Sequence, residues 1–380
     1  MTKPTYVVPS MADVRSIPWN GLRVASTFCG GGGSSLGYRM AGYKIIWASE
    51  FVESARETYR VNAHKDTIID SRDIRSVSAK DILSVTGLSV GDLDIFDGSP
   101  PCASFSTAGK RERGWGKQKQ YSDTVQRTDD LFFEFSRLVR ELQPKVFVAE
   151  NVSGLIEGTA KGYFIEILRE LGLCGYRVKC KLLDAQWLGV PQSRQRTIFI
   201  GVRNDLNREP IYPKPMAYRY SIRDAAPWIY RPSIDAPSDT ITACGTGGDV
   251  RYNWKVFAPV VEPEADISRY CTGREWEKLR IGEQSDRYFS LVRADPDKPS
   301  PTICASHGSS GIASVTHPFE RRKFSIAELR RICSFPDDFV LTGTYAQQWE
   351  RLGRAVPPLM MKAIAETIRD RIFDGGQRVV

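Results

Sequence analysis

The chain has 380 residues, of which 41% are hydrophobic and 26% are charged. This composition is ordinary for a globular protein of two or three domains and excludes disorder as its main state. No stretch approaches about 18 consecutive apolar residues, and the N-terminus lacks the apolar core of a signal peptide, so we expect a cytoplasmic protein without a membrane span. The net charge of +8 is a weak indication of a polyanionic partner.

The cysteine and histidine content does not predict a metal site. The eight cysteines form no Cys-x-x-Cys pair, and only three histidines are present. Zinc sites need such ligands in closely spaced groups, so we expect no metal. In a cytoplasmic chain of this size, most thiols are expected to be reduced and buried.

Apolar segments that resemble strands alternate with helical segments through the first half of the chain. The predicted strands cover residues 22–28, 43–49, 67–69, 93–96, 146–149, 176–184 and 196–203. Predicted helices begin near Leu36, follow Glu50, and cover residues 130–142 and 163–172. Strands and helices that alternate at this spacing predict an α/β fold with a doubly wound, mostly parallel sheet.

The alternation of strand-like and helical segments stops after about residue 205. Six prolines follow, from Pro210 to Pro237. Helical patterns return over residues 325–334 and 357–372. We therefore expect a first domain over residues 1–205, a second, smaller, irregular domain over 206–322, and a return segment over 323–380 that completes the first domain. Inside the second domain, residues 237–243 and 299–305 resemble each other, which two equivalent loops would explain.

Four consecutive glycines, residues 30–33, follow the first predicted strand and precede a helix. A glycine-rich turn at a helix N-terminus lets the backbone approach a nucleotide-type cofactor closely. Neither the GxGxxG pattern nor a P-loop is present. Glu50, at the end of the second strand, is placed to accept hydrogen bonds from a ribose diol, and Asp73, after the third, could meet an adenine amino group.

Two reactive side chains follow later strands. Cys102 comes after Pro100 and Pro101, just beyond a predicted strand. The carboxyl edge of an open α/β sheet is where ligands bind, so this thiol is a candidate nucleophile. Glu150 ends an apolar strand, and a partly desolvated carboxyl there could donate a proton near neutral pH.

Gln192, Arg194 and Arg196 alternate along a segment predicted to be extended. Alternate residues of an extended chain face the same side. Two guanidinium groups on one side suit a phosphate, a carboxylate or a base carbonyl. The alternative to such a binding site is a surface strand whose charged side chains are exposed to solvent.

These four features, in this order, resemble the DNA cytosine-5 methyltransferase family along nearly the whole chain. The glycine turn is similar to the S-adenosylmethionine loop. Gly98-Ser99-Pro100-Pro101-Cys102 is similar to the nucleophile motif, and Glu150-Asn151-Val152 is similar to the Glu-Asn-Val motif. Gln192, Arg194 and Arg196 are similar to the Gln-x-Arg-x-Arg motif. Two later segments resemble the Arg-x-x-x-x-x-Phe-Pro and Gly-Asn-Ala-Val-Pro motifs: residues 330–336 and 353–358.

The resemblance implies the S-adenosylmethionine-dependent methyltransferase fold and an enzyme that methylates C5 of cytosine in DNA. Cys102 would add to C6, Glu150 would protonate or hydrogen-bond N3, Arg196 would hold O2, and Arg194 would orient the base or a nearby phosphate. The target carbon is inaccessible inside a duplex, so the cytosine must be flipped out. The implied cofactor-binding residues are Phe28, Gly30, Gly31, Gly32, Gly33, Glu50, Phe51, Asp73, Ile74, Pro101, Leu131, Arg354 and Val356.

The implied partner is double-stranded DNA, and we expect a monomer associated with the nucleoid of a bacterial or phage-infected cell. Residues 103–128 carry six basic and two acidic side chains, and Gly114-Trp115-Gly116 suggests a loop tip. The resemblance makes this segment the base-flipping loop, with DNA contacts from Ser104, Ser106, Lys110, Arg111, Arg113 and Arg127. It also makes residues 206–322 the target-recognition domain, which would read base edges in the major groove.

Two positions depart from the family pattern. Ser26-Thr27-Phe28 stands where the family usually has Asp-Leu-Phe, and Arg354 stands where it has Asn. Arg354 could turn outward to a phosphate or a nearby glutamate, or it could weaken cofactor binding. It could also pair with an extra carboxylate, as in carboxy-S-adenosylmethionine, and the product would then be 5-carboxymethylcytosine.

Two rival functions remain at this point: a cytosine-5 methyltransferase acting on RNA, and a DNA-binding protein without catalysis. Many RNA enzymes carry the nucleophile on the strand that here ends in Ala149, Glu150 and Asn151, whereas this chain has its cysteine in the Pro-Cys motif. A transfer-RNA enzyme built on the DNA-type scaffold is still open. The presence of Cys102, Glu150 and Arg196 speaks against an inactive protein.

Overall fold

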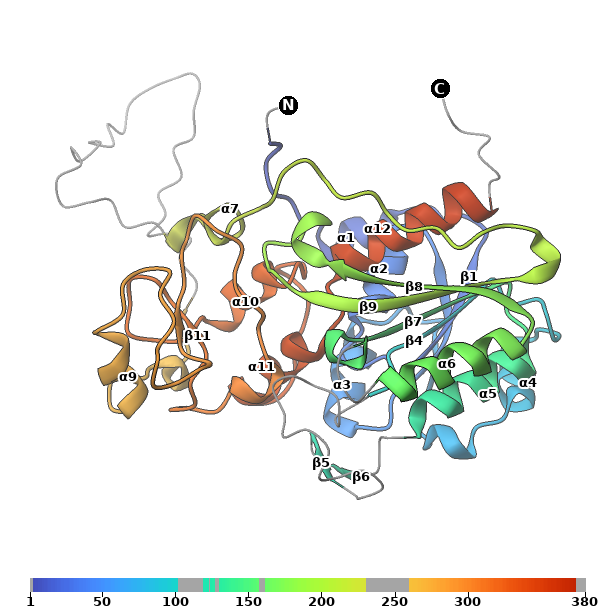
Figure 1. Ribbon diagram of the computed structural model, residues 1–380, viewed down its shortest axis with the longest axis horizontal. Coiled ribbons are helices and arrows are strands. Elements are labelled where there is room, and N and C mark those ends of the chain that lie inside the picture. Colours follow the sequence, from blue (N-terminus) through green and yellow to red (C-terminus); the bar gives the residue numbers. More distant parts are fainter. Residues whose placement is uncertain are drawn as a thin grey trace.

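A seven-stranded sheet forms the centre of the molecule (Figure 1). The computed structural model describes residues 3–101, 119–122, 124–126, 130–156, 161–229 and 260–373. From one edge to the other, the strands are β3 (Ile68–Asp70), β2 (Lys44–Ser49), β1 (Arg23–Thr27), β4 (Ile95–Gly98), β7 (Val146–Val152), β9 (Gln195–Arg203) and β8 (Tyr176–Asp184). β9 runs antiparallel to both of its neighbours, while the other pairs are parallel. The doubly wound, mostly parallel sheet is therefore confirmed.

Helices cover both faces of this sheet, so that its strands are buried on two sides. One face packs against α2 (Gly33–Met40), α3 (Glu53–Asn62) and α12 (Pro358–Ile368). The other face packs against α4 (Ala79–Thr86), α5 (Leu131–Leu142) and α6 (Lys161–Leu173) (Figure 1). Burial on both faces explains why strands such as β7 are continuously apolar rather than alternating.

The C-terminal segment returns to the sheet after a second lobe. α12 lies directly on α2, and a Cβ atom on Gly37 would come within 2.6 Å of the Met361 side chain. Glycine at this position lets the two helices approach closely. α12 begins at Pro358, as proline at the first turn of a helix permits.

The second lobe contains short elements joined by long connections. Apart from three short 3₁₀ helices, the described elements of this lobe are α7 (Ile222–Ala225), α9 (Cys271–Trp276), β10 (Val292–Arg293) and β11 (Val315–Thr316). A third apolar cluster joins this lobe to the N-terminal α1 (Met11–Ser16) and to α10 (Ile326–Ile332) and α11 (Tyr345–Arg354). The lobe extends to one side of the sheet in Figure 1.

Some elements were not expected from the sequence. α1, α4 and α11 are helices that begin with capping boxes at Ser10, Ser78 and Thr344. β5 (Lys119–Tyr121) and β6 (Thr124–Gln126) pair as a short antiparallel hairpin in the segment that follows Cys102. α1, α4, β5 and β6 are too short for a clear apolar periodicity. α11 is amphipathic, so its periodicity is the signal that could have predicted it.

Within the described residues, no helix is long and apolar enough to cross a membrane. Of the described cysteines, Cys29, Cys174 and Cys333 are buried, Cys180 and Cys304 are partly buried, and Cys271 is exposed. All six are free thiols.

Candidate active site

A cleft of about 920 Å³ opens at the carboxyl edge of the parallel strands. Its walls come from the glycine turn after β1, the ends of β2, β4 and β7, the start of β9, and two later segments, residues 302–306 and 351–356. The sequence places the motifs far apart, but the carboxyl ends of neighbouring parallel strands meet at one edge. The cleft therefore gathers nearly all the described candidate residues.

The glycine turn presents open backbone to this cleft. Phe28, Gly30 and Gly32 have positive φ angles of 52°, 54° and 97°, a conformation that glycine adopts without strain. A Cβ atom on Gly30 would meet nothing within 4 Å, whereas one on Gly33 would clash with the carbonyl oxygen of Val356. The turn thus leaves room for a ligand on one side and packs tightly against the final motif on the other.

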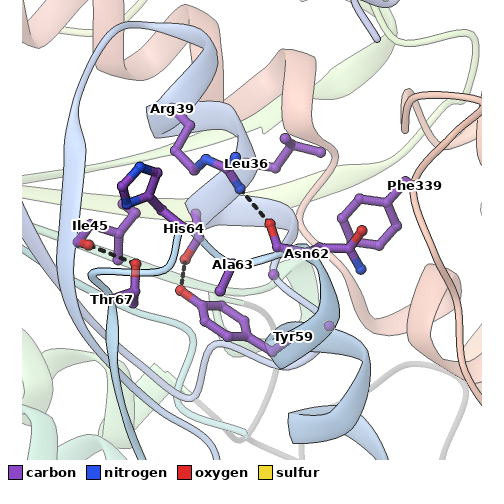
Figure 2. Close-up of a pocket in the computed structure, with 12 residues that line it drawn as sticks. Leu36, Arg39, Ile45, Tyr59, Asn62, Ala63, His64, Thr67 and Phe339 are labelled. Carbon is purple, nitrogen blue, oxygen red and sulfur yellow. Dashed lines mark hydrogen bonds between the residues drawn. The ribbon is translucent and has the colours of Figure 1, made fainter. Parts of the chain in front are cut away.

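Gly32 borders a second, smaller cavity. Tyr59, Asn62 and Phe339 also line this cavity (Figure 2). A Cβ atom on Gly32 would come within 3.1 Å of the Tyr59 ring. Tyr59 in turn donates a hydrogen bond to Ser35 Oγ at 3.0 Å, and Arg39 Nη1 donates to the carbonyl of Asn62 at 2.7 Å. Gly32 therefore packs against the protein interior, while Gly30, Gly31 and Gly33 line the larger cleft.

Glu50 holds the glycine turn in its conformation. The backbone N–H groups of Gly30 and Val52 donate to its two carboxylate oxygens at 2.7 and 2.8 Å. Burial raises the pKa of Glu50, although these two hydrogen bonds and nearby arginines act in the opposite direction. Carboxylate oxygens have further lone pairs, so Glu50 can still accept hydrogen bonds from a ligand in the cleft.

The remaining predicted cofactor residues surround the same part of the cleft. Phe51 lines the cleft and is 43% exposed despite its aromatic side chain. Its ring is therefore available to stack on a planar ligand. The carboxylate of Asp73 caps a short helical turn and pairs with Arg75, which also bridges to Asp130 at the start of α5. Further lining residues on the predicted list are Ile74, Pro101, Leu131, Arg354 and Val356.

Glu150 and Arg196 form an ion pair at the cleft wall. Glu150 lies on β7 opposite Ile198 of β9, and Arg196 lies opposite Val152. Residues two apart on a strand share a face, so this register brings the two side chains together diagonally. Arg196 Nε lies 2.7 Å from Glu150 Oε1, and both side chains are largely buried. A paired carboxylate and guanidinium can hold two neighbouring polar atoms of a planar ring.

Asn151 is a positioning residue that the sequence reasoning missed, although it lies in the recognised Glu-Asn-Val segment. Asn151 Nδ2 donates to the carbonyl of Pro100 at 3.2 Å, and Asn151 is buried. This contact ties the end of β7 to the segment that leads into Cys102. Cys102 itself lies outside the described residues, as do Ser104, Ser106, Lys110, Arg111, Arg113 and Arg127.

The other two members of the Gln-x-Arg-x-Arg motif have their hydrogen-bond partners in later segments of the chain. Gln192 is fully buried, accepts from the backbone N–H of Ile303 at 3.3 Å and donates to Cys333 Sγ at 3.2 Å. Arg194 is 1% exposed and donates to the carbonyls of Ile303 at 3.1 Å and Gly353 at 2.6 Å. Burial, with the nearby Arg196, lowers the pKa of Arg194 to about 9. These contacts favour a structural role that joins the second lobe and the final motif to β9.

We expect Arg194→Ala to lower the free energy of unfolding by about 2–4 kcal/mol, because two buried carbonyls lose their charged donor. Arg177→Ala is a matched control on β8, since Arg177 is half-exposed and its ion pair with Glu209 spans 3.6 Å. It should cost less than about 1 kcal/mol. Denaturant unfolding of both variants measures the difference, and equal losses would contradict the structural role.

Arg354 pairs with a glutamate, one of the outcomes anticipated for this unusual position. Arg354 Nε donates to Glu350 Oε1 at 2.7 Å, one helical turn earlier in α11. Glu350 Oε2 accepts from Ser122 Oγ at 3.2 Å, and Arg351 Nη2 donates to Ser54 Oγ at 2.6 Å and to Ser122 Oγ at 3.1 Å. α11 is thereby connected to α3 and to the hairpin of β5 and β6. Neither α11 nor Arg351 was expected at the site.

Three comparisons with known proteins indicate the family and the fold of this chain. A family model for C-5 cytosine-specific DNA methylase matches residues 22–370. The chain is 31% identical to the Type II methyltransferase M.DdeI of Desulfomicrobium norvegicum, over 91% of this chain and 88% of that protein. It is 32% identical to the Type II methyltransferase M1.HphI of Haemophilus parahaemolyticus, over 91% of this chain and 86% of that protein.

The fold is similar to that of a solved protein described as a DNA modification methyltransferase encoded within an E. coli prophage. The TM-score is 0.68 at 23% identity, over 93% of this chain and 100% of that one. The expected methyltransferase fold is thus confirmed. Because the family model covers nearly all of the chain, the enzyme class expected from the motifs is confirmed too: this protein belongs to the C-5 cytosine-specific DNA methylase family.

Proposed function

We propose that the protein transfers a methyl group from S-adenosylmethionine to C5 of a cytosine flipped out of duplex DNA. The observation that carries this proposal is the pair of Glu150 and Arg196, 2.7 Å apart, in the same cleft as the glycine turn and Pro101. A cytosine ring offers N3 and O2 on one edge. The pair supplies one group suited to each atom, next to the segment that ends in Cys102.

The proposed roles follow from the chemistry of each side chain. The Cys102 thiolate adds to C6 of the base, and this addition makes C5 nucleophilic. Glu150 donates a proton or a hydrogen bond to N3, and Arg196 holds O2 and keeps Glu150 oriented. After transfer, a base removes the C5 proton and the bond between Cys102 and C6 breaks. Arg194 acts through the backbone carbonyls that it holds.

The residues of the cleft fit S-adenosylmethionine, which supplies the methyl group when bound. Glu50 would accept hydrogen bonds from the ribose hydroxyls, Phe51 would contact the adenine ring, and the open backbone at Gly30 would adjoin the methionine portion. Asp73 would accept from the adenine amino group.

Duplex DNA is the proposed partner. The basic segment after Cys102, with Lys110, Arg111 and Arg113, would contact the phosphate backbone and flip the base, which makes binding salt-dependent. The division into residues 1–205, 206–322 and 323–380 is part of this proposal, with the middle part reading the target sequence. The short elements of the described part of the second lobe favour such a loop-based reader.

A covalent trap tests the proposal. Incubation with cofactor and duplex DNA containing 5-fluorocytosine is expected to give a protein–DNA adduct stable to denaturing gels, because fluorine cannot leave as a proton does. Cys102→Ala should give none, while Cys271→Ala, which removes an exposed thiol on α9, should give a normal yield. No adduct from the unaltered protein would contradict catalysis, and an adduct only with transfer RNA would favour the RNA alternative.

Carboxy-S-adenosylmethionine is the second candidate cofactor, with Arg354 as the partner of its carboxylate. Arg354 lines the cleft, but its pairing with Glu350 at 2.7 Å favours the ordinary cofactor. We expect Arg354→Asn to keep methyl transfer within about threefold, since it removes an ion pair that is one-third exposed.

Mass analysis of nucleosides from DNA treated with the enzyme and both cofactors together shows which cofactor donates the transferred group. Only 5-methylcytosine is expected. 5-Carboxymethylcytosine from the unaltered protein, absent with Arg354→Asn, would instead establish the alternative.

A further inference from the structure

Asp97 is a buried carboxyl group that the proposed mechanism does not use. It lies on β4, directly before the Gly98-Ser99-Pro100-Pro101 segment that leads to Cys102, and is 2% exposed. Burial of an acidic side chain costs free energy unless hydrogen bonds compensate for the loss of water. Its presence in the middle of the sheet therefore calls for a reason.

The hydrogen bonds of Asp97 connect three elements around the glycine turn. Ser26 Oγ on β1 donates to Oδ2 at 2.9 Å, and the Tyr38 hydroxyl on α2 donates to Oδ1 at 3.3 Å. The hydroxyl of Thr27 also donates to the backbone carbonyl of Asp97 at 3.1 Å. β1 enters the turn and α2 leaves it, so Asp97 fixes both ends of the turn relative to β4.

The strand register explains why Ser26 is the partner. β1 and β4 are parallel neighbours, and Ser26 lies directly opposite Asp97. Ser26 is also the position where the family pattern has Asp and this chain departs from it. The carboxyl group missing from β1 is thus present on the next strand, within hydrogen-bond distance of the residue that replaced it.

We propose that Asp97 takes over, from across the strand pair, the place of the carboxylate that the family pattern has at position 26, and acts as the positioning residue for the cofactor turn. This inference rests on the proposed function only for its cofactor readout. Asp97 and Ser26 are absent from the cleft wall, so Asp97 acts through the backbone of residues 27–33 rather than by touching a ligand.

A second carboxyl group on β1 would conflict with Asp97. In Ser26→Asp, two carboxyl groups would face each other at a separation now bridged by one hydrogen bond, where they could coexist only by sharing a proton. In the double variant Ser26→Asp/Asp97→Ser, one carboxyl and one hydroxyl are present again with their strands exchanged. The exchange therefore predicts that the losses in stability and in cofactor binding of the two single variants cancel in the double variant instead of adding.

A double-mutant cycle tests the exchange, with the melting temperature and the dissociation constant of S-adenosylhomocysteine by calorimetry as readouts. Asp97→Ser and Ser26→Asp are each expected to melt lower and to bind the probe about tenfold more weakly. The double variant is expected to recover to within about threefold of the unaltered protein. In methyl-transfer assays, the KM for S-adenosylmethionine should rise in the single variants while the KM for DNA stays constant.

Additive losses in the double variant, or unchanged melting and binding in Asp97→Ser, would overturn the exchange. Asp97→Asn keeps an oxygen acceptor for Ser26 and provides a folded comparison should Asp97→Ser be insoluble. In that case, weaker probe binding in Asp97→Asn together with recovered binding in Ser26→Asp/Asp97→Asn supports the exchange, and equal binding by both overturns it. Failure of the unaltered protein to bind S-adenosylhomocysteine would contradict the proposed cofactor instead, and the melting temperatures would still decide the exchange.

Discussion

Glu150→Gln is expected to lower kcat by about 10²–10⁴-fold, the usual contribution of a positioned proton donor. Glutamine keeps the shape of the side chain and can still accept from Arg196, but it cannot protonate N3 of the base. Glu150 contacts Arg196 rather than the glycine turn, so binding of S-adenosylhomocysteine should be unchanged. A loss confined to kcat identifies an interaction made only in the transition state.

Two further variants make this result specific. Glu166→Gln on α6 removes an exposed carboxylate away from the cleft and should leave kcat unchanged. Arg196→Lys keeps the charge but loses the planar fork of donors, so it should raise the KM for DNA more than it lowers kcat. Steady-state tritium transfer to duplex DNA measures all three variants. More than half of normal turnover in Glu150→Gln would contradict the proposed role.

The contribution of Asp97 to the free energy of unfolding is expected to fall as the pH rises from 4 to 7. Burial raises the pKa of Asp97 from 3.8 to about 7, although hydrogen bonds from Ser26 and Tyr38 oppose this and Glu150 adds to it. In this window the folded protein holds a proton that the unfolded chain has released. The stabilising contribution is thus fully present below pH 4 and lost as the pH passes 7, and it amounts to about 4 kcal/mol.

Asp97→Asn isolates this effect because the variant has no proton to lose. Other titratable groups that interact with Asp97, namely Glu150, Tyr38, Cys29 and Tyr59, remain in both proteins. Denaturant unfolding at pH 4.5 and pH 8 should show that the free energy of unfolding of Asp97→Asn rises relative to that of the unaltered protein as the pH rises. A constant difference between the two proteins would contradict a raised pKa.

An exposed aspartate provides a control of opposite sign. A hydrogen bond from Lys44 lowers the pKa of Asp66. Its stabilising effect is therefore present at neutral pH and lost as the pH falls below its ordinary range. Asp66→Asn should thus lose stability relative to the unaltered protein as the pH rises from acid to neutral.

Local pattern was enough to predict the sheet and the cleft. Strand β8 has the predicted bounds, and β1, β2, β7 and β9 differ from the prediction by a few residues at their ends. The candidate residues lie at strand ends, and the carboxyl ends of neighbouring parallel strands meet at a common edge. Sequence order and strand polarity therefore suffice to bring Glu50, Asp73 and Glu150 into one cleft.

Side-chain partners were less predictable where the chain is not a strand. The alternation rule predicts that Gln192, Arg194 and Arg196 share one side, but it does not name the partners of Gln192 and Arg194, which precede the start of β9 at Gln195. Before that point, Gln192 and Arg194 contact a segment more than 100 residues later, around Ile303. Such contacts depend on how the second lobe packs against the sheet, which no local pattern encodes.

The sequence by itself determined the fold class, the cleft and the family, because these depend on periodicity and on short motifs. Only the tertiary structure decided which partner each buried charge has: Arg196 with Glu150, and Asp97 with Ser26 on the neighbouring strand. The physical reason is the separation along the chain between the residues that interact. Secondary structure follows from neighbours within a few residues, whereas the pairing of buried charges follows from strand register and helix packing between distant segments.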